Sequence, residues 1–147
     1  MRLLFLLMLL AFPTGYAVTP EADVPAHAND VLADASLSLP PETARSIEEF
    51  DTTSDVQRRE AADASEGGVL LGQDVVTLGD PARPGFWVQT ALVDAETSGR
   101  AELLGAGGGA EVALVPTDGS GRISLAALRV LDVSFTDLVE EGVYDTR

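Results

Sequence analysis

The sequence contains no cysteine and no lysine, and histidine occurs once, at His27. Without cysteine the chain forms no disulfide, no thiolate zinc site and no thiol nucleophile. Without lysine it has no amine for a Schiff base and no lysine for a phosphate-binding loop of the Walker type. Since one histidine cannot build a histidine metal cluster, we expect no metal site and no cofactor.

Positive charge is also scarce, because nine arginines stand against 24 carboxylates and the formal net charge is −15. A surface this acidic repels phosphate backbones and anionic lipid headgroups. We therefore expect no binding to nucleic acid. The partners that this composition favours are neutral or cationic, such as cell-wall glycan or a basic protein.

The one long apolar run lies at the N-terminus, where residues 3–12 follow Arg2. This run is too short for a membrane-spanning helix, which needs about 20 residues. Pro13 ends the run, and Gly15 and Ala17 supply the small residues that signal peptidase reads. We interpret residues 1–17 as a cleaved signal peptide, with an uncleaved anchor or a buried core helix as the alternatives. The mature chain would be periplasmic or secreted and would have no stable membrane anchor.

Aromatic residues are scarce in residues 18–67, where Phe50 stands alone among twelve carboxylates and four prolines. Such a segment buries too little apolar surface to offset its chain entropy, so we interpret it as a disordered acidic linker. A proline pair, then acidic residues and then arginines predict a transient helix over residues 41–63. The segment is either a spacer or, around Ile47 and Phe50, a motif that folds onto a partner.

Residues 68–147 contain more β-branched residues and many turn dipeptides, and they predict one small β-rich domain. The fold class is mostly β or α+β, a small antiparallel β-barrel or sheet with one short helix. A helix is expected over residues 123–131, with Ser124 or a neighbour as its N-cap. The expected strand segments are residues 69–71, 75–78, 86–93, 100–104, 111–115 and 142–144.

The core of so small a domain should depend on its few aromatic side chains. Phe86, Trp87 and Phe135 are the aromatic residues that we expect in it, together with branched aliphatic residues.

Asp118 is the first candidate for catalysis, because it precedes the expected helix and Arg122 follows within reach. In that role Asp118 would be a general acid and Arg122 would orient a substrate. The structural alternative is that Asp118 and Gly119 form a tight turn near the positive end of the helix dipole.

Asp80, Arg83 and Trp87 are the candidate ligand-binding residues, since an aromatic face next to charged groups can stack on a sugar ring. The alternative is a turn followed by a core tryptophan.

Two further patterns predict ordinary structure. The glycine-rich residues 105–109 precede an expected strand and not a helix, so we expect a hairpin loop and not a phosphate loop. The carboxylates at Glu140 and Glu141, like those at Asp94 and Glu96, lack the spacing of a calcium loop, and we interpret both pairs as solvated.

Three stretches, residues 76–81, 84–90 and 121–129, resemble a group of small exported bacterial proteins of unestablished function. The resemblance covers roughly residues 50–147. Several of these proteins carry the name D-galactarate dehydratase, which implies dehydration of a sugar diacid. That chemistry uses a Lewis-acid metal, an iron–sulfur cluster or a well-placed base.

A β-stretch, Asp118-Gly119, Gly121-Arg122-Ile123 and an alanine-rich helix are similar in order to the end of the double-psi β-barrel of rare lipoprotein A-like septal proteins. Those proteins bind or cleave peptidoglycan. The resemblance implies a barrel fold and puts Asp118 at the acidic position of the motif. The tyrosine-glycine and histidine features upstream in that family are missing from this chain.

These observations lead to three hypotheses in order of preference. The first is an exported acidic envelope protein that serves as a non-catalytic binding or accessory module. The second is a peptidoglycan-active enzyme of double-psi barrel type that uses Asp118. The third is a sugar-acid dehydratase, for which the sequence offers few residues of suitable chemistry.

Overall fold

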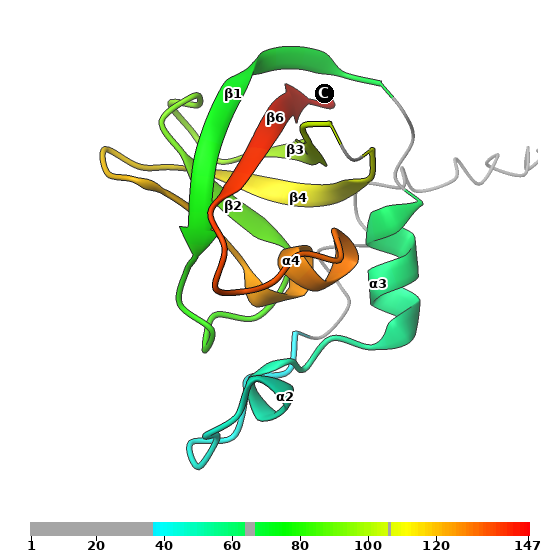
Figure 1. Cartoon of the computed structure of the whole chain (residues 1–147), viewed down its shortest axis with the longest axis vertical. Helices are drawn as coiled ribbons and strands as arrows, with labels where there is room; N and C mark the ends of the chain where they lie inside the picture. Colours follow the sequence, from blue (N-terminus) through cyan, green and yellow to red (C-terminus); the bar gives the residue numbers. More distant parts are fainter. Residues whose placement is uncertain (1–36, 64–66, 106) are drawn as a thin grey trace, which may run out of the picture.

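The computed structural model describes residues 37–63, 67–105 and 107–147. The expected signal peptide, residues 1–17, and the linker up to residue 36 lie outside the described residues. Six strands close into a barrel, and three short helices lie beside and below it in the view of Figure 1. The prediction of a small β-barrel with a short helix is confirmed.

The strands are β1 (Val69–Leu78), β2 (Trp87–Thr90), β3 (Thr97–Leu103), β4 (Gly109–Pro116), β5 (Gly121–Ile123) and β6 (Val139–Asp145). The helices are α2 (Ile47–Phe50), α3 (Asp55–Ala62) and α4 (Leu125–Val130). The order around the barrel is β1-β5-β2-β4-β3-β6. The pairs β1/β5 and β2/β4 are parallel and the other four are antiparallel, so the barrel is mixed and mostly antiparallel.

The strand pairing is unchanged when β1, β2 and β3 are exchanged with β4, β5 and β6. The pair β1/β5 becomes β4/β2, the pair β1/β6 becomes β4/β3, and β2/β5 and β3/β6 map onto themselves. We call β1–β3 the first half-barrel and β4–β6 the second. Val88 of β2 pairs with Ile123 of β5, so the exchange maps these two residues onto each other. Leu114 pairs with Val88 and Leu78 pairs with Ile123, so Leu114 and Leu78 occupy equivalent positions in the two half-barrels.

Alternate residues along each strand point into the barrel, as the pleat requires. On β4 the inward residues are Ala110, Val112 and Leu114, and on β6 they include Val139 and Val143. These small and branched side chains form the core between the strands.

Helix α4 begins after Ser124, as the sequence predicted. The Ser124 hydroxyl accepts hydrogen bonds from the backbone N–H groups of Ala127, at 3.2 Å, and of Trp87, at 3.1 Å. The N-cap therefore also attaches the helix to β2. Ala127 and Leu128 are buried and close the barrel at this side.

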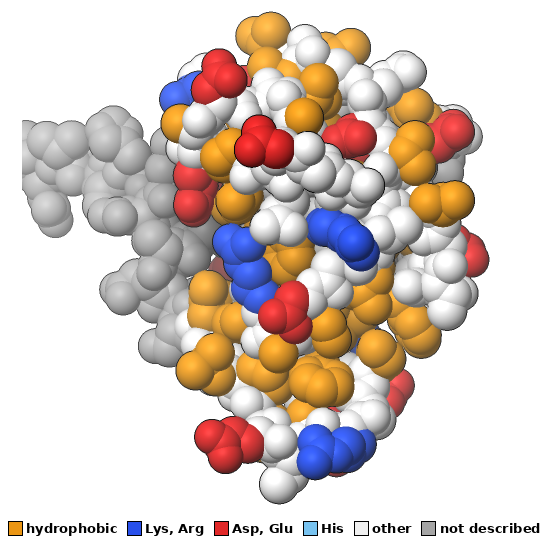
Figure 2. Space-filling model, turned by 90° about the vertical axis from the view of Figure 1, so that its left-hand side faces the viewer, with side chains coloured by type: hydrophobic (Ala, Val, Ile, Leu, Met, Phe, Trp, Pro, Cys, Tyr) orange, Lys and Arg blue, Asp and Glu red, His pale blue; other side chains and the backbone are white. Residues whose placement is uncertain are grey.

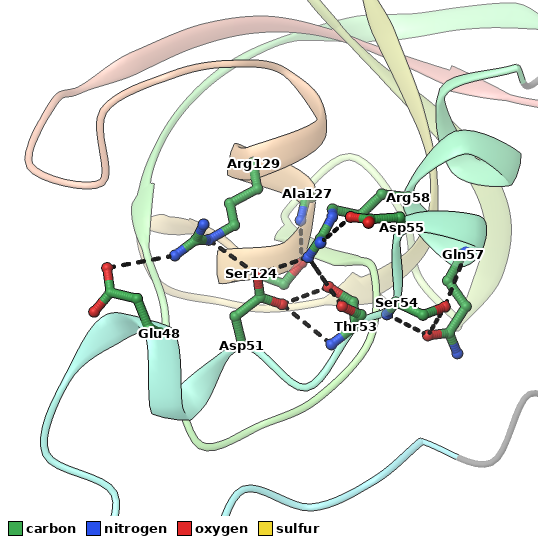
Figure 3. Close-up of polar contacts among 10 residues, drawn as sticks. All are labelled: Glu48, Asp51, Thr53, Ser54, Asp55, Gln57, Arg58, Ser124, Ala127 and Arg129. Carbon is green, nitrogen blue, oxygen red and sulfur yellow. Dashed lines mark hydrogen bonds and ion pairs between the residues drawn. The ribbon is translucent and has the colours of Figure 1, made fainter.

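Residues 37–63 pack against the barrel, although we expected a linker with a transient helix. Helix α3 contacts α4 and β4, and its Ala61 is fully buried. Asp51, between α2 and α3, points toward Arg58 and toward Arg129 of α4 (Figure 3). The N–O distances of these ion pairs are 2.9 and 3.0 Å. This part of the segment therefore belongs with the folded domain.

Several details differ from the expected elements. Phe135 was expected in the core, but its side chain is 43% exposed because it lies in the loop before β6. Strand β1 continues through Gly72 with a register shift that absorbs the irregularity. The first residue of the expected helix, Ile123, instead ends β5.

Among the described residues, no helix combines the length and the apolar character needed to cross a bilayer.

Candidate functional site

The structure does not bring the two candidate catalytic residues together. Asp118 lies in the exposed loop between β4 and β5, and its carboxylate forms no hydrogen bond or ion pair with the described residues. Arg122 extends along the barrel wall, where it donates to the Thr77 hydroxyl at 3.3 Å and to the Leu78 carbonyl at 3.4 Å. Arg122 therefore joins β5 to β1 and does not face Asp118.

The three candidate ligand-binding residues do lie together, but the arrangement is that of a core tryptophan beneath a turn. Trp87 is 3% exposed, its indole N–H donates to the Arg83 carbonyl at 3.3 Å, and the Arg83 guanidinium covers its ring at 4.6 Å from the centroid. Asp80 holds the turn by accepting from the Ala82 N–H at 2.9 Å. Since Arg83 occupies the outer ring face in a cation–π contact, no face of Trp87 is open for a sugar.

Glu141 corrects the expectation that the carboxylates of β6 are all solvated. Glu140 points outward and is exposed, whereas Glu141 is inside the barrel with none of its surface exposed. The inward residues on either side of it are Val139 and Val143. This alternation was present in the sequence and is the signal that would have identified Glu141.

Asp74 lies directly opposite Glu141 in the β1/β6 register. Its carboxylate accepts hydrogen bonds from the Thr90 hydroxyl at 2.7 Å and from the Val75 N–H at 2.8 Å. The Thr90 hydroxyl in turn accepts from the Leu92 N–H at 3.3 Å. Glu141 is different, because neither carboxyl oxygen has a hydrogen-bond partner among the described residues.

Burial raises the pKa of Glu141 to about 8, and the nearby charge of Asp74 adds to the increase. Both causes disfavour a second negative charge in the barrel interior. Glu141 is therefore protonated at neutral pH.

Neither a protein-family model nor a curated protein nor a solved structure matches this chain.

The carboxyl pair occupies a position that the other half-barrel fills with alanine. Asp74 is four residues before Leu78, and Ala110 is four residues before its equivalent, Leu114. Ala110 pairs with Ala101, just as Asp74 pairs with Glu141, and both alanines are fully buried. The barrel geometry alone thus does not require polar side chains at this position.

Among the described residues, no cluster of three or more histidine, cysteine, aspartate or glutamate side chains is arranged to hold a metal ion.

An apolar groove lies on the outside of the barrel, where β1, β3 and β6 approach the loop before β6. We call it the β1–β6 groove. Val75 and Leu138 expose 49% and 72% of their surfaces there, and Leu104 exposes 40%. Asp137 and Glu140 add two carboxylates to its lining. The full lining is Val75, Leu103, Leu104, Val133, Asp137, Leu138, Val139 and Glu140.

The acidic excess is spread over the surface and not gathered in one place on the face drawn in Figure 2. On that face carboxylates are scattered among exposed apolar side chains and a few arginines.

Proposed function

We propose that the mature chain is an exported, non-catalytic accessory protein that binds a basic, partly apolar segment of another protein in the β1–β6 groove. The observation that supports this best is the pairing of exposed aliphatic side chains with two carboxylates in one groove. An export signal in residues 1–17 supports a periplasmic or secreted location.

The apolar part of the groove supports a protein partner. Contiguous patches of exposed aliphatic side chains are uncommon on monomeric proteins and often mark binding sites. Leu138 is among the most exposed of the described large apolar residues. Leu104 and Val75 continue this surface across two strands. A partner segment would cover these side chains and remove them from water.

The charge of the groove supports a basic partner. Neither Asp137 nor Glu140 forms an ion pair with an arginine of the described chain, so both carboxylates remain available to a partner cation. The net charge of −15 attracts a basic segment from a distance and repels an acidic one. Charge thus favours the basic protein over the glycan among the partners expected from composition.

The closed barrel restricts how a partner can bind. The six strands close into a barrel, so none of them is the edge strand of an open sheet. Recognition would therefore use side chains in the groove.

Calorimetric titration of the mature chain, residues 18–147, with two synthetic peptides tests this proposal. One peptide has leucine and arginine in amphipathic helical spacing, and the other has glutamate in place of each arginine. We expect the arginine peptide alone to bind, with an affinity that Leu138→Glu lowers by about tenfold or more.

Leu39→Glu is the matched control, since Leu39 is 76% exposed and lies outside the groove. Both variants add one negative charge, so a loss specific to Leu138→Glu reports the groove and not the net charge. Equal losses in the two variants, or equal binding of the two peptides, would contradict the proposal.

A peptidoglycan-active enzyme that uses Asp118 is the second candidate. The observation in its favour is a closed barrel in which Gly121-Arg122-Ile123 leads directly into α4, the order on which the double-psi resemblance depends. Co-sedimentation with purified peptidoglycan, with mass spectrometry of the released fragments, distinguishes the two candidates. Fragment release that disappears in Asp118→Asn would establish the enzyme, whereas the absence of release would leave the accessory module.

A further inference from the structure

The barrel interior, between β6 and β1, contains an arrangement that the proposed function does not use. Glu141 and Asp74 face each other across β6 and β1, and Glu141 is completely enclosed. Neither oxygen of the buried Glu141 carboxyl group has a hydrogen-bond partner among the described residues, and burying an ionised carboxylate in this way costs free energy. The arrangement therefore indicates that a proton is bound there.

The groups that face Glu141 provide no positive charge. From β1 it meets Asp74, β2 supplies the buried Thr90, and β3 supplies the buried Thr97, whereas the buried residues of β4 are apolar. The arginines of the neighbouring strands point outward. Arg100 of β3 stacks on Tyr144 and pairs with Glu102, and Arg122 of β5 binds β1 from outside.

Two carboxylates that face each other without a cation, one of them fully buried, cannot both keep their charge. The hydrogen bonds from Thr90 and Val75 stabilise negative charge on Asp74, whereas Glu141 receives none. A proton is therefore better placed on Glu141, whose O–H can then donate to the Asp74 carboxylate.

We propose that Glu141 and Asp74 form a buried proton-binding site that makes the stability of the barrel depend on pH. Glu141 holds the proton at neutral pH, and Asp74 is the carboxylate that accepts its hydrogen bond. This inference requires no partner and does not depend on the proposed function.

The direction of the pH dependence follows from proton linkage. The pKa of Glu141 rises from its usual 4.5 to about 8 on folding, so the folded chain holds a proton that the unfolded chain has lost between these values. Stabilisation from this group is complete below about pH 4.5 and is lost as the pH rises toward 8. Within that window the folding equilibrium constant should fall about tenfold per pH unit because of this group.

Urea unfolding of the mature chain between pH 5 and 9 tests the proposal, with fluorescence of Trp87, the single tryptophan, as the signal. Glu141→Gln should lose the decline between pH 5 and 8 that the wild type shows, because an amide does not titrate. Glu140→Gln is the matched control on the outer face of the same strand, and it should keep the decline. A decline that persists in Glu141→Gln would overturn the proposal.

A second measurement covers the case in which Glu141→Gln does not fold. In wild-type protein labelled with ¹³C at glutamate side chains, NMR should show one carboxyl carbon that titrates near pH 8. Its midpoint should fall in Asp74→Asn, which removes the neighbouring charge. Absence of any glutamate that titrates above pH 6 would contradict the proposal.

A cation is the competing occupant of this site. We expect the same stability at pH 7 with calcium chloride, with magnesium chloride and with a chelator. A change of stability with either cation that disappears in Glu141→Gln would show a cation site and would overturn the proton site.

Discussion

The two half-barrels share one pattern of strand pairing but differ at one equivalent interior position. The first half-barrel closes against β4 with the pair Ala101–Ala110, and the second closes against β1 with Glu141–Asp74. The two alanines fill the barrel interior at this position without burying a polar group, so no desolvation free energy is lost. The carboxyl pair occupies the same place at the expense of desolvation, which indicates a role other than filling space.

The half-barrels also differ in their outer cover. Between β2 and β3 the chain makes a short turn, whereas the equivalent connection, between β5 and β6, contains α4. Helix α3 packs against α4, and Arg129 of α4 forms an ion pair with Asp51 (Figure 3). The second half-barrel thus contributes the buried Glu141 and carries an added helical layer, and substitutions in the two halves should have different consequences.

The largest effect should come from placing a carboxyl group in the alanine half. Ala101→Glu would bury an acid between packed side chains that offer no hydrogen-bond donor like Thr90. We expect a loss of about 3–5 kcal/mol in the free energy of unfolding at pH 7, measured by urea titration.

Glu102→Gln, on the outer side of the same strand, serves as the control and should change stability little. A small effect of Ala101→Glu would mean that this interior admits water. The two half-barrels would then differ in the residues at this position but not in how well they tolerate a buried carboxyl group.

The second effect tests the helical layer on the second half-barrel. Asp51 has 6% of its side chain exposed and pairs with Arg58 and Arg129, so Asp51→Asn leaves two guanidinium groups without their shared carboxylate. The arginines are partly exposed and can regain water, which limits the loss to about 2 kcal/mol. Urea unfolding measures the loss, and proteolysis should show faster cleavage within residues 37–63.

Asp55→Asn separates the buried ion pair from a surface one. Asp55 also binds Arg58, at 2.6 Å, but 78% of its side chain is exposed. Its replacement should leave proteolysis of this segment nearly unchanged. Equal effects of the two variants would show that Asp51 does not hold the segment against α4.

Local signals predicted the parts of this fold that depend on neighbouring residues. Leucine spacing and the Ser124 cap identified α4, and turn dipeptides separated the main strands. Capping boxes at Ser46 with Glu49 and at Ser54 with Gln57 were also visible, and they could have indicated two short helices in place of one over residues 41–63. Composition predicted disorder there because it does not reveal that Ala44 and Ala61 are buried or that Asp51 is shared by two arginines.

The strand order of the barrel and the composition of its interior depend on pairing between residues far apart in the sequence. The parallel pairs β1/β5 and β2/β4 join strands that no local pattern connects, and β5 has only three residues. Asp74 and Glu141 become neighbours through the β1/β6 register, so their shared environment could not be deduced from either local sequence. The inward orientation of Glu141 could be deduced from its alternation with Val139 and Val143, but its burial required a closed barrel.

The smallest effect at neutral pH should come from the acid at the end of β6, Asp145, which contrasts with Glu141 on the same strand. Hydrogen bonds from Arg147, with the charge of its guanidinium, lower the pKa of Asp145 to about 2. Because the pKa falls on folding, its contribution is present above about pH 4 and is lost as the pH falls toward 2, the opposite direction to Glu141. Asp145→Asn should leave stability at pH 7 nearly unchanged, since the side chains of Arg147 and Asp145 are 66% and 20% exposed and water screens their ion pair, and should slightly flatten the acid side of the urea profile. A flattening on the alkaline side instead would mean that β6 responds to pH as a whole, and the distinction between Glu141 and Asp145 would fail.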